Sequence, residues 1–576
     1  MHVGERRGNW TKEEGFADMK PVRYDQDEIE KNLKEGHWDK TILPDYWDRN
    51  ARQWPHREAM VDSVGSRLTW AQARQRMDRI ALALVKDIKL NRDDRLMVQL
   101  PNCCEQVLVR LACEKAGVLS IPEMTTFRQS ELAQIASRTE AVGIVILRHY
   151  RNFDHYQMAK ELQADLPKLK HVFLVGEEVP EDCISLQEVM EHPYEQEYDL
   201  IELEARKLDA VEEVGFLVTT TGTTGVPKLI EHRIAAREIW TAKAHIRNWQ
   251  LGPDDCVLAI APLAGAAGGT PAYVTAPVAG ARIALEYQYR GEETLEFMER
   301  EKVTVIALVP TQLARLLELP LDKYNLSSLR IIKTAGGYLP PPLAKDAEER
   351  FGCPILGTYG TQDTGSISGV PITASDEHRY TTVGRLHPGI EIKVLDESSG
   401  KPVKPGEVGT LWFKGPGNSI GYYRDLEKTM AEAFDEDGFA TPGDLVKVTD
   451  DGYLRIMGRK KDIIIRGGQN IYPKEIEDYL LAHAKVTNAA VVPMPDPIMG
   501  ERACALVTVR KGERFSFDEM VDYLKGKKIA AFKLPERLEV METFPLVGES
   551  GKIDRKAMAQ MIADRLNGEG NNKTVK

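Results

Sequence analysis

The stretch Thr219–Lys228, TTTGTTGVPK, decides how the rest of this 576-residue chain is interpreted. It follows Val214–Val218 (VGFLV), a short apolar run typical of a buried strand. Threonines, two glycines and a lysine are concentrated in ten residues, and glycines let backbone N–H groups approach an anion closely. The composition predicts a phosphate-binding loop, and the strand before it argues against the alternative of a polar linker. It is not a Walker loop, because Pro227 precedes the lysine and Leu229 follows it.

The overall composition argues against several classes of protein. Apolar residues make up 42% and charged residues 28% of the chain, as in ordinary globular proteins, and the length favours several domains. A formal net charge of -12 and the lack of a basic stripe in the sequence argue against nucleic-acid binding. The seven cysteines are scattered and form no CxxC pair, so neither a disulfide framework nor a zinc site is indicated.

No membrane or export segment is predicted. The N-terminal stretch MHVGERRGNWTKEEGF lacks the apolar core of a signal peptide. The longest weakly polar stretch, Ala259–Leu285, is interrupted by glycines and prolines and contains Arg282, so we expect it to form core and loop. The expected compartment is the cytoplasm.

The order of apolar runs predicts the fold class. Helical patterns alternate with short apolar runs from Tyr46 to about Leu147, and a similar unit recurs between Arg282 and Leu319. This alternation predicts an α/β fold with largely parallel sheets flanked by helices. From Gly384 the chain is rich in strands and turns, which indicates a β-rich subdomain. We predict a large N-terminal domain over residues 1–459, a small α+β domain over 460–566 and a polar tail over 567–576.

Five later stretches stand out because, like the opening loop, they combine glycine with polar or charged residues. Each alone has an ordinary explanation as a core aromatic, a turn residue or a surface charge. In chain order they are YGTQD at 359–363, GFATPGDL at 438–445, GRKKD at 458–462, RGGQNIYPKEIE at 466–477 and PLVGESGKIDR at 545–555.

In this order and spacing the stretches resemble the acyl-adenylate-forming superfamily of acyl- and aryl-CoA ligases, adenylation domains and luciferase. The resemblance covers nearly the whole chain, from about Gly15 to Met561. GFADMKPVRYDQDEIEKNLKEGHW near the start and IAAFKLPERLE near the end are similar to the dihydroxybenzoate- and salicylate-adenylating branch. GGQNIYPKEIE is nearer to what CoA ligases of the superfamily carry.

The resemblance implies a two-step reaction that uses ATP, Mg²⁺ and coenzyme A. A substrate carboxylate attacks the α-phosphate of ATP to give acyl-AMP and pyrophosphate, and the acyl group then passes to a thiol. Because the first step brings anions together, cations and N–H donors have to offset the charge. Lys552 is similar to the family's adenylation lysine, and Lys228 belongs to the pyrophosphate-binding loop. The implied nucleotide-binding residues are Thr220, Thr221, Gly222, Thr223, Thr224, Gly225, Gly336, Gly337, Tyr338, Tyr359, Gly360, Thr361, Asp444 and Arg459.

Four further residues are implied for the metal and for the second step. Asp363 stands where the family usually has a glutamate that holds magnesium, so a carboxylate remains on a shorter side chain. Lys461 matches the pivot about which a mobile small domain rotates. Gly467 and Gly468 match the hairpin beside the pantetheine channel, where glycine lets the arm lie close to the backbone.

The turn that begins at Pro262 bears on the choice of acid. The aryl-acid branch usually carries a His-Asn pair here, whereas this chain has Gly265 and Ala266, with Ala267 in place of an aromatic residue. A buried hydroxyl without a partner is disfavoured by roughly 1–3 kcal/mol. We therefore expect a wider, less polar pocket for benzoate-like, alicyclic or branched acids, with Thr358 as a polar contact. Refilling of this space by shifted helices or loops is the alternative.

Three functions follow, in order of preference. The first is an AMP-forming carboxylate–CoA ligase for aryl or alicyclic acids, with its oligomeric state, a homodimer included, left open. The second is a stand-alone aryl-acid adenylating enzyme that loads the phosphopantetheine of a carrier protein in trans, since no carrier signature follows Lys552. The third is a non-catalytic nucleotide-binding scaffold, against which the joint presence of Lys552, Asp444 and Arg459 argues.

Overall fold

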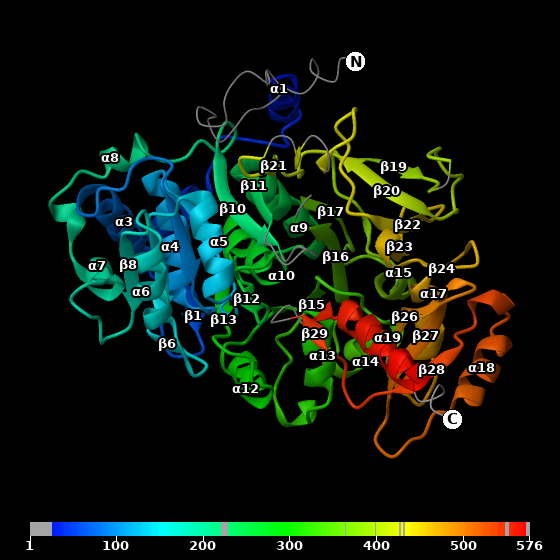
Figure 1. Cartoon of the computed structure of the whole chain (residues 1–576). Helices are drawn as coiled ribbons and strands as arrows, with labels where there is room; N and C mark the ends of the chain where they lie inside the picture. The colour runs from blue at the N-terminus through cyan, green and yellow to red at the C-terminus, as the bar shows by residue number, and fades with distance from the viewer. Residues whose placement is uncertain are drawn as a thin grey trace.

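Parallel sheets flanked by helices form most of the chain, as the computed structural model shows (Figure 1). A β-rich part and a small C-terminal part follow in chain order. The α/β class with a separate small C-terminal domain is therefore confirmed. The structure describes residues 26–220, 228–362, 365–397, 399–425, 428–429, 433–547 and 552–571, with side chains to residue 566.

The first sheet has eight strands and carries the predicted phosphate loop at the end of its strand β10. Strands β10, β4, β3, β5 and β8 run parallel, whereas β11 returns antiparallel to β10. In spatial order the strands are β21 (Gly421–Tyr422), β11 (Lys228–Arg233), β10 (Val214–Thr220), β4 (Leu119–Pro122), β3 (Arg95–Gln99), β5 (Gly143–Leu147), β8 (His171–Val175) and β9 (Ile184–Ser185).

The second sheet has nine strands, and its central strands are also parallel. Their residues are almost all buried and apolar, as expected for strands covered on both faces. In spatial order they are β18 (Arg385–Leu386), β17 (Gly365–Gly369), β16 (Ile355–Thr361), β15 (Ile331–Thr334), β14 (Val305–Leu308), β12 (Cys256–Ala259), β13 (Arg282–Leu285), β1 (Glu58–Asp62) and β2 (Arg67–Thr69).

Helices cover both sheets, and local sequence explains where they start. Helix α3 (Trp70–Lys86) begins at a capping box: the Thr69 hydroxyl accepts from the Gln72 amide, and the Gln72 side chain accepts from the Thr69 amide. The helix lies within the region from Tyr46 to about Leu147 where helical patterns are predicted to alternate with apolar runs. The other helices of this part are α1 (Gln26–Lys34), α2 (Leu43–Gln53), α4 (Cys104–Ala116), α5 (Gln129–Thr139), α6 (His155–Asp165), α7 (Leu186–Glu191), α8 (Ile201–Glu204), α9 (Thr241–Trp249), α10 (Ala266–Gly269), α11 (Ala276–Ala279), α12 (Glu292–Arg300), α13 (Pro310–Leu317), α14 (Pro341–Phe351) and α15 (Asp376–Thr381).

Two segments adjoining these helices are wound more widely, as π-helix. They are η3 (Ala235–Trp240), which leads into α9, and η4 (Thr270–Thr275), which joins α10 to α11. Such segments are rare in proteins and frequently occur at functional sites. Both contribute residues to the narrow cavity described below.

The β-rich part confirms the change of character predicted from Gly384. Four antiparallel strands form its sheet, with Asp444 at the start of one strand and Arg459 at the end of its neighbour. The strands are β19 (Glu391–Leu395), β20 (Gly409–Lys414), β22 (Asp444–Val448) and β23 (Leu454–Arg459).

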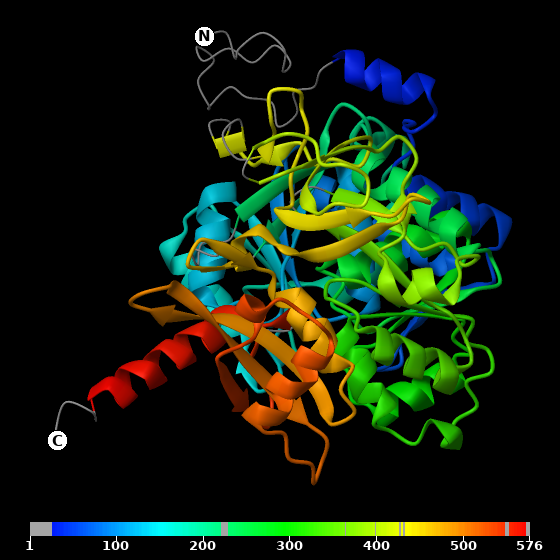
Figure 2. The same ribbon diagram turned by 90° about the vertical axis from the view of Figure 1, so that its right-hand side faces the viewer.

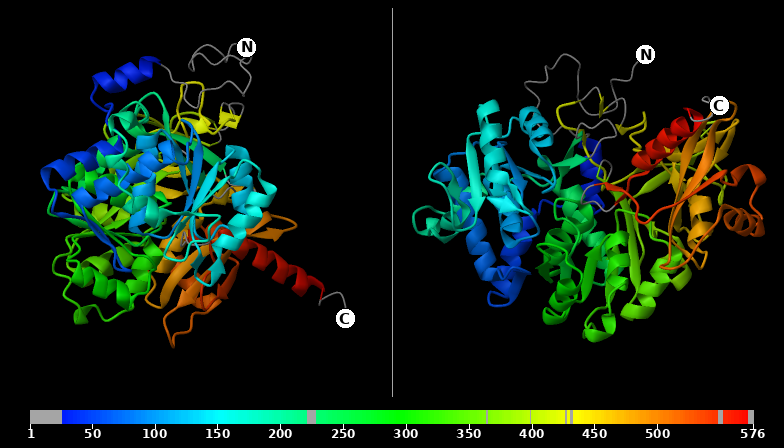
Figure 3. Two further views of the ribbon diagram at one scale, coloured as in Figure 1. Left: turned by 90° about the vertical axis from the view of Figure 1, so that its left-hand side faces the viewer. Right: turned by 60° about the horizontal axis from the view of Figure 1, so that its bottom comes forward.

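The small C-terminal part has its own sheet and its own apolar core on each face of that sheet (Figure 2). A hairpin that carries Lys552 extends from it toward the large domain (Figures 1 and 3). Its elements are η7 (Lys460–Asp462), β24 (Ile464–Arg466), β25 (Gln469–Ile471), α17 (Pro473–Leu481), β26 (Val486–Asp496), β27 (Gly500–Val509), α18 (Phe517–Gly526), β28 (Arg537–Val540), β29 (Leu546–Val547), β30 (Lys552–Ile553) and α19 (Arg555–Asn571).

Helix α19 differs from the predicted end of the small domain. It continues to Asn571, into the stretch predicted to be a polar tail. Once Met558 and Ile562 are buried on the sheet, extending the helix costs little, because each added residue gains a backbone hydrogen bond. Of the helices that the structure describes, none combines the length and apolar character needed to cross a bilayer.

Candidate functional site

The predicted nucleotide-binding residues gather where strands of three sheets end. Strand β10 ends at Thr220, and β15 leads into Gly336 and Gly337. Strand β16 supplies Tyr359, Gly360 and Thr361. In open α/β sheets, ligands bind outside the carboxyl ends of the parallel strands. The topology therefore places these residues where a ligand is expected.

The base of the phosphate loop is anchored on both sides. Lys228 begins β11 opposite Thr220, and its Nζ lies 3.0 Å from the Tyr422 hydroxyl. The Thr219 hydroxyl donates to a carboxylate oxygen of Glu123 at 3.0 Å, and burial raises the pKa of Glu123 well above its usual value. The loop residues Thr221, Gly222, Thr223, Thr224 and Gly225, together with Asp363, lie outside the described residues.

Tyr359, Asp444 and Arg459 come together as one polar cluster. The Tyr359 hydroxyl donates to one Asp444 oxygen at 2.6 Å, and Arg459 Nε lies 2.9 Å from the other. Asp444 is only 4% exposed, and burial raises its pKa while Arg459 and Tyr359 oppose that rise. The antiparallel register of β22 and β23 places Asp444 opposite Arg459, which explains why these residues form an ion pair although they are 15 positions apart in sequence.

Two predicted glycines permit close packing in this region. Gly336 has φ +79°, and a Cβ there would lie 3.6 Å from Val309 Cγ1 and 3.7 Å from Ala267 Cβ. Gly360 lies at a register shift between β16 and β17, where a Cβ would clash with the carbonyl of Gly365. At Gly336 the positive φ favours glycine, and at Gly360 the backbone of β17 leaves no room for a side chain.

Tyr338 contacts the small domain, a feature that the sequence did not predict. Its hydroxyl donates to Asp478 on helix α17, and Lys474 Nζ lies 3.3 Å from the centre of its ring. Lys474 also bonds Asp478 at 2.8–2.9 Å. This predicted nucleotide-binding residue therefore also joins the two domains.

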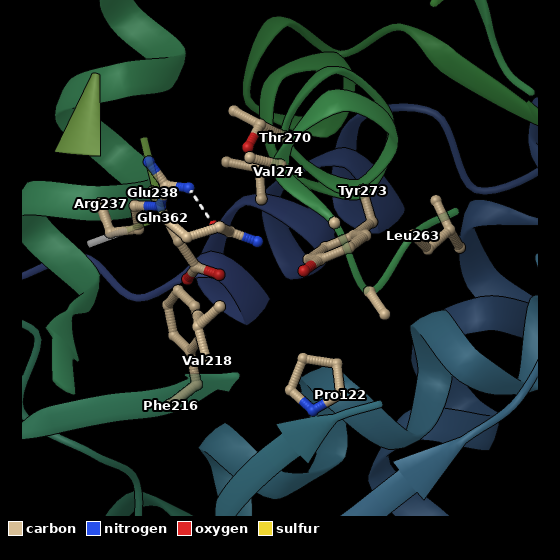
Figure 4. A pocket seen from close by; sticks show the side chains of 13 residues that line it. Pro122, Phe216, Val218, Arg237, Glu238, Leu263, Thr270, Tyr273, Val274 and Gln362 are labelled. Atoms are coloured by element: carbon tan, nitrogen blue, oxygen red, sulfur yellow. Dashed lines mark hydrogen bonds between the residues drawn. The ribbon is translucent and has the colours of Figure 1, made fainter. Parts of the chain in front are cut away.

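Gly265 and Ala266 line a narrow cavity, which the charged residues Arg237 and Glu238 also line (Figure 4). Gln362 bridges two elements here: its amide oxygen accepts from Arg237 at 2.8 Å, and its backbone oxygen is 2.9 Å from His232 Nε2. Pro262, Ala267 and Thr358 do not line this cavity. The lining consists of Pro122, Phe216, Val218, Arg237, Glu238, Leu263, Ala264, Gly265, Ala266, Thr270, Tyr273, Val274 and Gln362.

Glu238 places a buried carboxyl group in the lining of the cavity. Arg110 forms two ion pairs in this buried group of charges, one with Glu238 at 2.8 Å and one with Glu114 at 2.6 Å. The second Glu238 oxygen, Oε2, has no hydrogen bond in the described part of the chain. Figure 4 shows the Glu238 carboxyl and the Tyr273 hydroxyl pointing into the same space.

Because of Glu238, the cavity is more polar than its small residues alone indicate, and the sequence analysis did not identify this residue. Burial raises the pKa of Glu238, and the neighbouring Arg110 opposes that rise. The signal that could have revealed it is the charged pair Arg237-Glu238 inside the otherwise apolar run IAAREIW.

The residues predicted for the second step lie in the small C-terminal part. Lys461 belongs to η7, directly after β23. Gly467 and Gly468 form the turn between β24 and β25 with φ of +54° and +81°, the left-handed region that favours glycine. Lys552 begins β30, is exposed and pairs with Val547 in the hairpin.

Comparison with known proteins gives two matching family models. The one described as AMP-binding enzyme matches residues 47–423, and the one described as AMP-binding enzyme C-terminal domain matches residues 475–552. The first alone spans more than half of the chain.

Curated relatives match over most of their length. The chain is 32% identical over 528 residues to 2-hydroxy-7-methoxy-5-methyl-1-naphthoate–CoA ligase of Streptomyces carzinostaticus, which covers 91% of this chain and 93% of that protein. It is also 32% identical to 2,3-dihydroxybenzoate-AMP ligase of Bacillus subtilis (strain 168), over 85% of this chain and 88% of that protein. The anthranilate CoA ligase AuaEII in complex with anthranoyl-AMP has the same fold, with a TM-score of 0.80 at 21% identity over 96% of this chain and 100% of that one.

Proposed function

This chain belongs to the family of AMP-binding enzymes, and we propose that it activates an aryl or alicyclic carboxylic acid with ATP and transfers the acyl group to coenzyme A. The family membership and the relatives support activation of an acid as acyl-AMP by an AMP-forming ligase. The acceptor thiol and the acid are the parts that we add.

The cluster of Tyr359, Asp444 and Arg459 is the observation that carries the proposal. Asp444 is a buried carboxylate at the strand ends, which suits it to accept hydrogen bonds from the ribose hydroxyls of ATP. Arg459 opposes the rise that burial causes in the pKa of Asp444, because a cation beside a buried acid favours its charged form. We assign the ring of Tyr359 to one face of adenine.

Two lysines are assigned to the charge that develops in the first step. Lys228, at the end of the phosphate loop, would stabilise the pyrophosphate that leaves, with Mg²⁺ as its counter-ion and Asp363 as the proposed metal ligand. Lys552, on the hairpin that extends toward the large domain, would bridge the attacking carboxylate and the α-phosphate. A preorganised cation costs no reorganisation during the reaction, which is why such groups lower barriers strongly.

The second step is assigned to the small domain. We propose the domain boundary between residues 459 and 460, where β23 ends and η7 begins, with Lys461 as the pivot. Rotation there would withdraw Lys552 and bring the Gly467–Gly468 turn to the site. Coenzyme A is the proposed acceptor, as the names of several relatives indicate for those proteins.

A carrier-protein acceptor is the second candidate function. Relatives of the same similarity include a salicyl-AMP ligase / salicyl-S-ArCP synthetase of Mycobacterium tuberculosis, 32% identical over 541 residues. The acid-activating step is common to both candidates, so only the acceptor distinguishes them.

The test is acid-dependent exchange of pyrophosphate into ATP, followed by thioester formation. A panel of plain and hydroxylated ring acids is assayed for exchange, and the active acids are then offered with coenzyme A. ATP-dependent acyl-CoA formation supports the proposal. Formation of acyl-AMP that coenzyme A never accepts would favour the carrier-protein function, and no exchange with any acid would favour a non-catalytic scaffold.

A further inference from the structure

Lys333 is a buried lysine with few partners among the described residues. It belongs to β15, is 1% exposed, and within the described part of the chain its Nζ donates one hydrogen bond, to the carbonyl oxygen of Ala267 at 3.3 Å. An ammonium group can donate three. Its neighbours in register, Ala307 on β14 and Leu356 on β16, are apolar. Nothing in the strand itself therefore requires a cation at this position.

The position of Lys333 is beside the predicted acid pocket. Its one partner, Ala267, is a predicted pocket residue, and Ala267 Cβ lies 3.7 Å from where a Cβ on Gly336 would be. Thr358, another predicted pocket residue, follows Leu356 by two positions on the adjacent strand. Because side chains alternate along a strand, Thr358 and Lys333 lie on the same face of the sheet.

The described groups around Lys333 are cations and histidine rings and supply no negative charge. Lys333 and Arg237 are both close enough to His245 to lower the pKa of its ring. The ring of His387 lies 5.8 Å from that of His245, measured between ring centres. Burial lowers the pKa of His387 to about 4 and that of His245 well below its usual value, so both rings are neutral at pH 7. His245 Nε2 is buried without a hydrogen bond in the described part of the chain.

An uncompensated buried cation is costly, and hydrocarbon of the same shape would cost less. Burial alone lowers the pKa of Lys333 to about 7, and no carboxylate among the described residues counteracts this shift. Stability therefore does not account for a lysine here. A ligand group that accepts hydrogen bonds would supply the missing partner.

We propose that Lys333 binds a second acceptor group on the substrate, a carboxylate or a carbonyl placed on the ring away from the carboxylate that reacts. The inference rests on the proposed function, because it takes the acid site to lie between Ala267, Gly336 and Thr358. It narrows the substrate class from ring acids in general to ring acids that carry such an acceptor.

The experiment compares matched acids in the pyrophosphate exchange assay. Benzoate is paired with isophthalate, and cyclohexanecarboxylate with 4-oxocyclohexanecarboxylate, so that the two arms separate a carboxylate from a carbonyl. Wild-type enzyme is expected to prefer the acceptor-bearing member of at least one pair. Lys333→Met should reduce that preference roughly 10- to 100-fold, mainly through KM, because a hydrogen bond to a charged group is lost. Plain acids should lose far less.

Two controls keep the result interpretable. Leu356→Met changes the apolar neighbour of Lys333 in register and should leave the preference unchanged. Lys333→Gln keeps a donor and should retain part of the preference, which a packing defect would not do. Equal loss for both members of a pair, or a wild-type preference for the plain acid in both pairs, would overturn the inference while the proposed function stands. No exchange with any acid would instead overturn the proposed function, and the inference with it.

Discussion

Replacing Tyr338 by phenylalanine removes the hydroxyl that joins the large and small domains, and we expect it to slow the first half-reaction more than the second. The hydroxyl donates to Asp478 on α17 in the arrangement that directs the Lys552 hairpin toward the large domain. Rotation of the small domain would break this contact. The ring of Tyr338 is kept, as is the Lys474 ammonium 3.3 Å from its centre.

The expected size of this effect follows from the solvent exposure of Tyr338 and Asp478. A hydrogen bond to a charged group contributes about 1.5–3 kcal/mol when it is buried. Here Tyr338 is 40% exposed and the Asp478 side chain 41%, so water competes for both groups. About 1 kcal/mol remains by comparison with exposed ion pairs, which is roughly a fivefold change in the ratio of the two domain arrangements.

Two assays separate the half-reactions. Pyrophosphate exchange reports on adenylation, and conversion of supplied acyl-AMP to thioester reports on the second step. We expect exchange to fall about two- to fivefold in Tyr338→Phe, with the second step unchanged or faster and KM for ATP unaltered. Asp478→Asn should act in the same direction, since it weakens the acceptor of the same contact.

A matched control is Tyr380→Phe. The Tyr380 hydroxyl donates to Glu348 at 2.7 Å within the large domain, so its loss removes a similar bond without affecting domain rotation. If Tyr338→Phe slows both half-reactions by the same factor, or Tyr380→Phe reproduces its effect, the contact has no role in selecting the domain arrangement and the reasoning fails.

Three further predictions concern the proposed site. Lys552→Ala should reduce pyrophosphate exchange at least 100-fold while acyl-AMP is still converted to thioester; equal loss in both assays would contradict rotation of this residue out of the site. Asp444→Asn should raise KM for ATP roughly tenfold, because an amide neither balances Arg459 nor accepts as strongly from hydroxyls; an unchanged KM in an ATP titration of exchange would refute the ribose assignment. Lys333→Met should unfold at a higher temperature than wild type at pH 7, because burial lowers the pKa of Lys333 from 10.5 to about 7. Between pH 7 and 10.5 the unfolded chain binds the lysine proton more readily than the folded chain, so the stability of wild type should rise with pH in this range. The difference in unfolding temperature between wild type and Lys333→Met should therefore shrink as the pH rises. A variant less stable than wild type throughout this range would show that Lys333 stabilises the fold.

The sequence predicted those parts of the molecule whose cause is local. Alternation of helices with apolar runs follows from periodicity, and the position of Lys228 at the end of the phosphate loop follows from the motif. Asp444 and Arg459 were identified through the family resemblance. Their pairing was not predicted; it follows from the antiparallel register of β22 and β23.

The features that were missed depend on contacts between distant parts of the chain. Tyr338 and Asp478 are 140 positions apart, and nothing near either residue indicates the other. Arg110 on α4 reaches Glu238 on η3, 128 positions away. Lys333 ends an apolar run and looks in sequence like the exposed last residue of a strand, whereas the helix of the Pro262 turn covers it.

These distant contacts change how the Pro262 turn is interpreted. Gly265 and Ala266 border a cavity that contains the unpaired oxygen of Glu238, an acceptor. Ala267, the next residue, borders Lys333, a donor. Small residues therefore do not make the region apolar, because polar groups of opposite character lie on neighbouring elements. Under the proposed function, we expect the acid to be selected by which of these two groups its ring substituent meets. Because a lost partner for either buried group costs more than a lost apolar contact, exchanging small residues within the turn should alter the size of acid accepted, whereas Glu238 and Lys333 should determine its substituents.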